Sequence, residues 1–157
     1  MTKPLGDRLP ERVVRALDGT DLEDKIGTAY LLVSVDGDGL PRVCMLSAGE
    51  ILAVDDRHLR LALWPKTRTS ANLSRGGPVL LCFVERDTVL YIRGAGQPLG
   101  RSSRLGVERF DVEVRSIDSD AHPGMPVTQP IAFSIGTDDP KDVARAWRER
   151  LDDLRDA

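Results

Sequence analysis

The chain has 157 residues, 41% hydrophobic and 30% charged, which suits one globular domain with a real core and leaves too few residues for two. Its net charge of -3 lacks the basic excess typical of nucleic-acid binding, so no nucleic-acid partner is expected. The sequence shows no signal-peptide pattern and no apolar run long enough to cross a bilayer, which predicts a cytoplasmic protein without a membrane partner.

The cysteine and histidine positions give no indication of a metal site. Cys44 and Cys82 both lie in apolar runs, where a small buried hydrophobe is a better interpretation than a disulfide or a metal ligand. His58 and His122 stand far apart, and no CxxC or HExxH spacing is present. We therefore expect no bound metal.

The first expected elements are two short helices. Pro10 can begin the first, because apolar residues follow it at helical spacing as far as residue 17. Residues 20–23, Thr-Asp-Leu-Glu, have the capping-box pattern that can open the second, and Gly27 would end it. We expect residues 1–26 to pack as a helical lid on the rest of the chain.

From residue 28 the apolar pattern becomes strand-like. Strands are predicted over residues 29–35, 42–47, 50–54, 58–64, 79–84, 88–93, 107–117 and 131–135. The turn Asp-Gly-Asp-Gly at 36–39 is a strong hairpin signal. The segment 79–84 is nearly all apolar, so we expect it to be buried on both faces. Gly94 and Gly96 indicate a bulge or a close backbone approach.

Two helices interrupt and end this series of strands. The first is predicted over 65–75, with Pro65 near its start and Gly76-Gly77 at its end. The last is capped by Asp138 or Asp139, begins at Pro140 and carries an apolar stripe. The stripe consists of Val143, Trp147, Leu151 and Leu154. Short strands joined by hairpins favour a closed antiparallel barrel, and no GxGxxG follows a strand as a dinucleotide-binding α/β fold would require.

The best candidate for a site is the segment 64–73, WPKTRTSANL, where a strand ends and a helix begins. Free backbone amides at a helix start attract anions; Lys66 adds a point charge, and Arg68 adds a planar fork that can grip two phosphate oxygens. Neutral donors come from Thr67, Thr69 and Ser70. An ordinary capped helix start is the other interpretation, although cations there oppose the helix dipole unless an anion neutralises them.

Two further features have a plain structural interpretation beside the functional one. The strand 41–47, PRVCMLS, contains an arginine at Arg42, and taken alone it is better explained as a core strand with one exposed charge. Trp64 could stack on a ring, but packing in the core is the preferred interpretation.

The order of strand, DGDG turn, PRVCMLS strand, hairpin and LRLALWPKTRTSANL resembles the pyridoxamine 5'-phosphate oxidase-like FMN-binding split barrels, over roughly residues 27–94. The resemblance implies a mainly β fold, an antiparallel Greek-key split β-barrel with short N-terminal helices, one inserted helix and a C-terminal helix. It also implies a single domain over residues 1–157. Its parts would be the lid 1–26, the barrel 27–135 and the C-terminal helix 138–157.

The resemblance further implies where a cofactor would lie. In that family the first returning strand runs along the isoalloxazine ring of FMN, which points here to Arg42, Val43, Cys44, Met45, Leu46 and Ser47. The next strand end and helix start hold the phosphate, which points to Leu63, Trp64, Lys66, Thr67, Arg68, Thr69 and Asn72. Thr69 stands where many members have a lysine, and Lys66 could replace that charge. A second subunit usually completes the site, which implies a homodimer.

The implied function is that of a small flavin-dependent oxidoreductase with an unknown small-molecule substrate. Flavin itself carries out hydride or electron transfer, so a sequence without an evident catalytic residue is compatible with this function. The alternatives are a flavin- or deazaflavin-binding or sensing protein without turnover, and a barrel without a cofactor. Oxidation of vitamin B6 is not expected, because residues 115–157 lack the RxH pattern of the family's oxidase.

Overall fold

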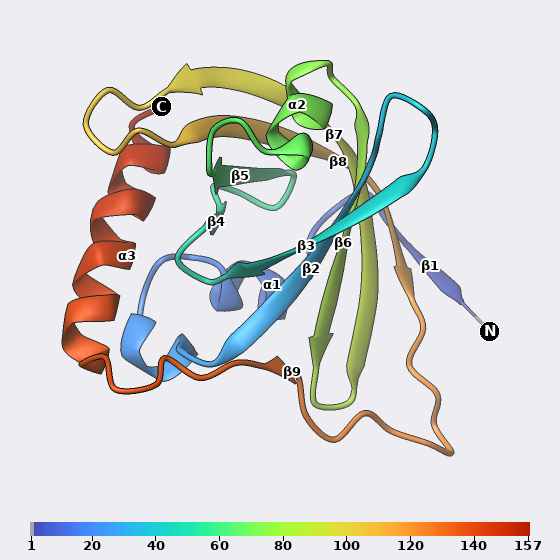
Figure 1. Cartoon of the computed structure of the whole chain (residues 1–157). Coiled ribbons are helices and arrows are strands. Elements are labelled where there is room, and N and C mark those ends of the chain that lie inside the picture. Colours follow the sequence, from blue (N-terminus) through green and yellow to red (C-terminus); the bar gives the residue numbers. More distant parts are fainter. Residues whose placement is uncertain (1) are drawn as a thin grey trace.

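A computed structural model describes residues 2–157 as one antiparallel sheet that curls into a split barrel (Figure 1). The strands are β1 (Lys3–Gly6), β2 (Thr28–Val35), β3 (Pro41–Ser47), β4 (Ile51–Ala53), β5 (His58–Leu63), β6 (Pro78–Glu85), β7 (Thr88–Arg101), β8 (Glu108–Ser119) and β9 (Ile131–Ala132). Their order is β3-β2-β6-β7-β8-β5-β4, with β1 beside β8 and β9 beside β2. The predicted split-barrel fold class is confirmed.

Over the described residues 2–157, four helical segments accompany the strands. They are α1 (Glu11–Ala16), the 3-10 helix η1 (Leu22–Lys25), α2 (Arg68–Ser74) and α3 (Pro140–Arg155). As predicted, Asp139 caps α3, and its carboxylate accepts a hydrogen bond of 2.8 Å from the Lys141 amide. Figure 1 shows α3 standing at the side of the barrel, where it contacts β4, β5 and η1.

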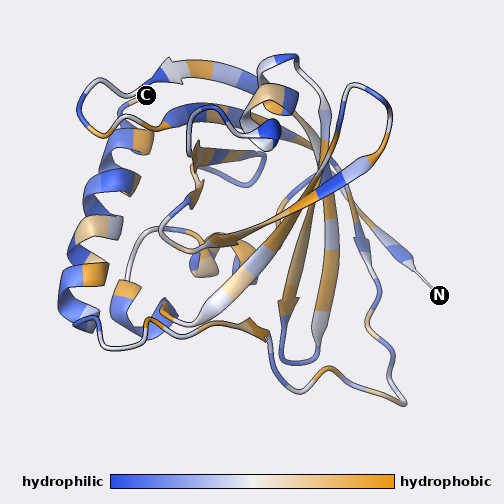
Figure 2. Ribbon diagram, viewed as in Figure 1, coloured by the Kyte–Doolittle hydropathy of each residue, from blue (hydrophilic) through white to orange (hydrophobic). Residues whose placement is uncertain are grey.

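The core lies inside the curled sheet and is closed by the helices. Val13 and Leu17 from the α1 region are fully buried, and the rings of Tyr30 and Phe83 stack with centroids 5.5 Å apart. Figure 2 shows hydrophobic residues concentrated along β6 and β7, whereas α3 is largely hydrophilic with separate hydrophobic bands. On α3 the predicted stripe faces the core, with Trp147, Leu151 and Leu154 buried.

Gly94 and Gly96 of β7 are close approaches, as predicted. A Cβ at Gly94 would lie 2.5 Å from the Glu113 carbonyl oxygen, and the pairing of β7 with β8 shifts between Arg93 and Gly94. A Cβ at Gly96 would lie 2.8 Å from Cγ of Leu73. Gly96 therefore lets α2 pack directly against the backbone of β7.

The capping box predicted for residues 20–23 is wrong. Asp21 caps η1 in a left-handed conformation with φ of 48° and without a side-chain hydrogen bond. The Thr20 hydroxyl instead donates to the Asp18 carboxylate at 2.7 Å. With its hydroxyl used outside the helix, Thr20 cannot cap it, and the segment forms a single tight turn.

Other differences concern burial and strand length. The segment 79–84 buries only one face, because Val79, Leu81 and Phe83 are buried while the alternate residues are partly exposed. Both cysteines are free but only partly buried. The last strand is shorter than expected, at Ile131–Ala132, and β7 continues past residue 93 to Arg101.

Candidate functional site

Within residues 2–157, β3 is an edge of the sheet, because β2 is its only partner and β4 forms the opposite edge. Its side chains alternate: Leu46 is buried, whereas Val43 and Met45 are 57% and 67% exposed. An open edge carries unpaired backbone donors and acceptors, and apolar side chains on it are surface that a ligand or another chain can cover. The predicted ring-binding strand is thus accessible on its outer side.

The start of α2 lies against the middle of this strand. Thr69 in the first turn of α2 is buried and lies close enough to the Cys44 thiol of β3 to influence its pKa. Burial raises the pKa of the Cys44 thiol, and the contact with Thr69 opposes that rise. Thr69 is therefore beneath the surface, between α2 and β3, rather than on the face where Lys66 and Arg68 are exposed.

The hydroxyls of Thr67 and Ser70 cap α2. Thr67 Oγ1 accepts a hydrogen bond from the Ser70 amide at 3.1 Å, and the Thr67 amide donates to Ser70 Oγ at 3.2 Å. This reciprocal capping box accounts for both residues without a ligand. Helix capping is thus a sufficient explanation for these hydroxyls. It does not explain the two cations of the segment, Lys66 and Arg68.

Lys66 precedes the cap in an unusual backbone conformation. Its φ of 62° is in the left-handed region, which non-glycine residues seldom adopt. Its side chain is exposed, as is that of Arg68, whose side chain is 72% accessible. Both cations of the WPKTRTSANL segment thus face solvent at the same turn.

Asp36 is the residue that the sequence analysis treated only as part of a turn. Its carboxylate accepts from Arg42 Nη2 at 2.7 Å and from Arg42 Nε at 2.9 Å. It also accepts from Asn72 Nδ2 at 2.8 Å and lies 3.8 Å from Arg68 Nη1. The hydrogen bonds from Arg42 and Asn72 lower the pKa of Asp36 to about 2. The cue was present in the sequence as an acid beside an arginine across a tight hairpin.

This network changes how two of the predicted site residues are interpreted. Arg42 is held by Asp36 and is not a free cation. Asn72 is buried, donates to Ser34 Oγ at 3.0 Å, and accepts from Arg75 Nη2 at 2.7 Å. In this structure Arg42 closes the β2–β3 turn through Asp36, whereas Asn72 joins that turn to α2. The contact of both residues with a cofactor stays a prediction.

Trp64 lies at the surface, with 60% of its area exposed, and the interpretation of this residue as core is wrong. Its ring is 6.0 Å from the guanidinium carbon of Arg150, which comes from α3. Leu63, its neighbour in the sequence, is buried. Ser47, at the end of β3, donates its hydroxyl to Glu50 Oε2 at 2.9 Å. The remaining predicted site residues therefore include exposed side chains, such as Trp64, and buried ones, such as Leu63.

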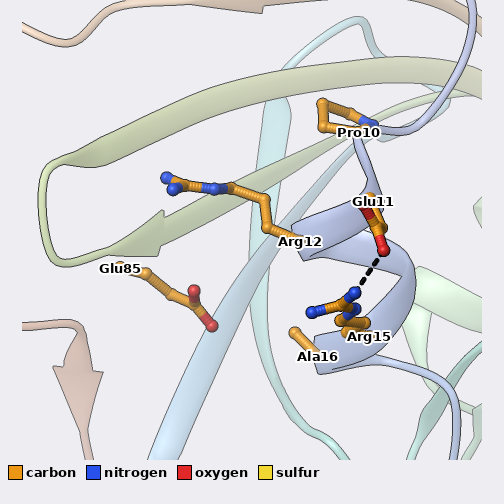
Figure 3. A pocket seen from close by; sticks show the side chains of 6 residues that line it. All are labelled: Pro10, Glu11, Arg12, Arg15, Ala16 and Glu85. Atoms are coloured by element: carbon orange, nitrogen blue, oxygen red, sulfur yellow. Dashed lines mark hydrogen bonds and ion pairs between the residues drawn. The ribbon is translucent and has the colours of Figure 1, made fainter.

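A separate open hollow lies beside α1 and is charged on its walls (Figure 3). Arg15 pairs with Glu11 on the same helix, and Arg12 donates to the Thr88 hydroxyl. Glu85 points toward this helix from the end of β6, and its burial raises its pKa. The arginines are engaged within the chain, and none of the predicted site residues lies here.

Within residues 2–157, no cluster of three histidine, cysteine or acidic side chains has an arrangement that could hold a metal ion. In the same part of the chain, no helix combines the length and the apolar character needed to cross a membrane.

Comparison with known proteins gives one relative by sequence. The chain is 30% identical over 149 residues to the uncharacterised protein YclD of Bacillus subtilis, covering 94% of this chain and 96% of YclD. No family model matches the chain.

Three solved structures share the fold at low sequence identity. A candidate pyridoxamine 5'-phosphate oxidase of Lactobacillus delbrueckii matches with a TM-score of 0.58 and 18% identity, over 73% of this chain and 98% of that one. HupZ of Group A Streptococcus matches with a TM-score of 0.56 and 15% identity, over 72% of this chain and 95% of that one. A candidate 5-nitroimidazole resistance protein of Bacteroides thetaiotaomicron matches with a TM-score of 0.51 and 12% identity, over 76% of this chain and 86% of that one. These likenesses concern the fold alone.

Proposed function

Because the chain belongs to the family of YclD and has the fold of the pyridoxamine 5'-phosphate oxidase-like split barrels, we propose that it binds FMN and works as a small flavin-dependent oxidoreductase. The observation that carries the proposal is the meeting of an open strand edge with a cationic turn. Within residues 2–157, β3 has no partner on its outer side, and α2, which begins at Arg68 two residues after Lys66, packs against it.

The residues present suit the two ends of FMN. The exposed edge of β3 offers backbone groups and the apolar side chains of Val43 and Met45 to a flat ring that also has polar edges. Lys66 and Arg68 are exposed cations that can pair with a phosphate monoester. Arg68 is only loosely tied to Asp36, at 3.8 Å, so its guanidinium can turn toward a phosphate.

Asp36 reduces the number of cations that are available to a phosphate at this site. It neutralises Arg42, which leaves Lys66 and Arg68 as the proposed phosphate cations. Thr69, in the position where relatives of this fold often have a lysine, is buried against Cys44 and adds no charge. We therefore expect weaker retention of FMN than a third cation would give, by about one to two decades in Kd.

When bound, FMN would supply the hydride or electron transfer. The chain's own residues would hold the phosphate through Lys66 and Arg68 and keep the ring against β3. Asp36 and Asn72 would keep the β2–β3 turn joined to α2, so that strand and cations stay in register. No general acid or base is required of the protein for this role.

The proposal includes a homodimer. Val43, Met45 and Trp64 present exposed apolar surface around the proposed site. The outer face of β2 and β6 adds a partly exposed apolar strip with Val33 and Leu80. Contiguous surface of this kind supports an interface with a second copy, which would shield the ring from water.

A binding or sensing protein without turnover is the second candidate, and the uncharged Thr69 position favours it because a loosely held flavin or deazaflavin suits reversible binding. The deciding experiment mixes FMN-loaded protein with NADPH and an electron acceptor. Flavin-dependent oxidation of NADPH would support the enzyme. Bound flavin that neither NADPH nor NADH reduces would contradict the enzyme and support the sensing protein.

A further inference from the structure

A cavity of about 360 Å³ lies between the end of β3, the segment after β9 and the first turns of α3. We call it the α3 cavity. Its volume is in the range of small-molecule sites. The lining is mainly apolar, with Met45, Phe133, Val143 and Trp147 among its residues. Met45 and Phe133 are 67% and 37% exposed, so apolar surface is open to solvent here.

Trp147 is a fixed wall of this cavity. A Cβ at Gly49 would lie 2.2 Å from Cγ of the indole, so the ring rests directly on the backbone at Gly49. The ring centroids of Phe133 and Trp147 are 6.5 Å apart, and the two ring planes are tilted by 51° to each other. Trp147 is itself buried. Because little of the indole is exposed, this aromatic wall favours flat ligands that pack edge-on against it.

In the part of the chain that the structure describes, Arg150 is the one cation that lines the α3 cavity. Its Nη1 donates to the Gly49 carbonyl oxygen at 3.3 Å, and its guanidinium carbon is 6.0 Å from the Trp64 ring. Neither partner carries a charge, and no ion pair within residues 2–157 includes Arg150. A partly buried arginine without a carboxylate keeps most of its donors available for an anion.

Two carboxylates also line the cavity, and they differ in their engagement. Glu50 accepts from the Ser47 amide at 2.7 Å and from its hydroxyl at 2.9 Å, which holds it in the turn after β3. Asp138 is exposed in the loop before α3. Asp138 would repel a bound anion, and it offers a matched test of charge at the same cavity.

From this arrangement we infer that the α3 cavity binds a small planar carboxylic acid, with its flat apolar part against Trp147 and its carboxylate on Arg150. The cavity shares Met45, Leu46 and Ser47 with the strand proposed to hold the flavin ring. An acid bound here would therefore lie beside that ring as a candidate substrate. This last role rests on the proposed function, whereas binding of the acid does not.

The test compares two probes of the same shape, naphthalene-2-carboxylate and naphthalene-2-carboxamide, on flavin-free protein. The chain has two tryptophans, so the variant Trp64→Phe leaves Trp147 as the single indole reporter of binding by fluorescence. We expect the acid to bind at least about tenfold more tightly than the amide, the effect of one charge-assisted contact. Equal binding of the two probes, or no quenching by either at millimolar concentration, would overturn the inference.

Variants assign the preference to one residue. In the Trp64→Phe background, Arg150→Gln should bring acid and amide to within about twofold of each other, while Arg150→Lys keeps part of the preference. The control Asp138→Asn should keep the preference or increase it. An unchanged preference in Arg150→Gln would contradict the role of Arg150. FMN binding is measured separately. Binding of the acid without binding of FMN would contradict the proposed function and leave this inference standing. Binding of FMN without a preference for the acid would contradict this inference alone.

Discussion

At the scale of single residues, Asp36 determines which cations of the candidate site are available. It fixes Arg42 through a two-pronged ion pair and binds Asn72, while Arg68 remains at 3.8 Å. The cations were predictable from the sequence because their residue types and spacing are visible in the chain. Their internal partner Asp36 was not, because pairing across a turn depends on how the hairpin closes onto α2.

Asp36 should contribute to stability in a pH-dependent way. Its pKa is about 2 in the folded protein against 3.8 for the free side chain, so its ionised form stabilises the fold above pH 4. That contribution is lost as the pH falls from about 4 to about 2. We expect Asp36→Asn to lower Tm at neutral pH, with the difference from wild type shrinking through this window.

The control for that measurement is Asp38→Asn in the same turn. Asp38 is exposed, and within residues 2–157 its carboxylate accepts only from the Leu40 amide, at 3.1 Å. A Tm difference for Asp36→Asn that stays constant down to pH 2 would show that the ion pair is not what stabilises the turn.

The exposed cations should govern FMN affinity. Lys66→Ala and Arg68→Ala each remove a charged partner of the phosphate, so each should weaken FMN binding about tenfold to a hundredfold. Flavin fluorescence titration measures this effect. Arg148→Ala on the exposed side of α3 is the matched control and should bind FMN as the wild type does. Wild-type affinity for FMN in both site variants would show that Lys66 and Arg68 do not bind the phosphate.

At the scale of elements, the hairpins were predictable because apolar alternation and turn residues agree along the chain. The β2–β3 turn and the helix start after β5 lie where those patterns end. β1 was not predictable, because its exposed residues Lys3–Gly6 are held by pairing with β8 and not by an apolar face. The extension of β7 beyond Gly94 was hidden by glycines and a proline that normally end strands.

Packing of α2 on β7 should be sensitive to one added methyl group. Gly96→Ala would put a Cβ 2.8 Å from Cγ of the fully buried Leu73, so α2 must shift. We expect a loss of about 1–3 kcal/mol in the free energy of unfolding, measured by urea denaturation, and weaker FMN binding. Gly37→Ala, whose Cβ would meet nothing nearer than 4.0 Å, is the control. Equal stability of the two variants would contradict this packing argument.

At the scale of the whole molecule, the open β3 edge raises the question of what covers it. We expect a second copy to do so, and Met45→Glu should therefore disrupt both the dimer and FMN binding, because a charge would be buried at the interface. Light scattering gives the mass. Met125→Glu, at a methionine that is 74% exposed in the loop before β9, should remain dimeric. A wild-type protein that is monomeric at micromolar concentration would rule out the dimer.

The central claim is that this barrel binds FMN, and the visible absorption spectrum of the purified protein tests it most directly. The spectrum is recorded as isolated, and again after addition of FMN and removal of free flavin by desalting. We predict a flavin band that survives desalting at close to one FMN per chain. A protein that is colourless as isolated and loses all added FMN on desalting would contradict the claim.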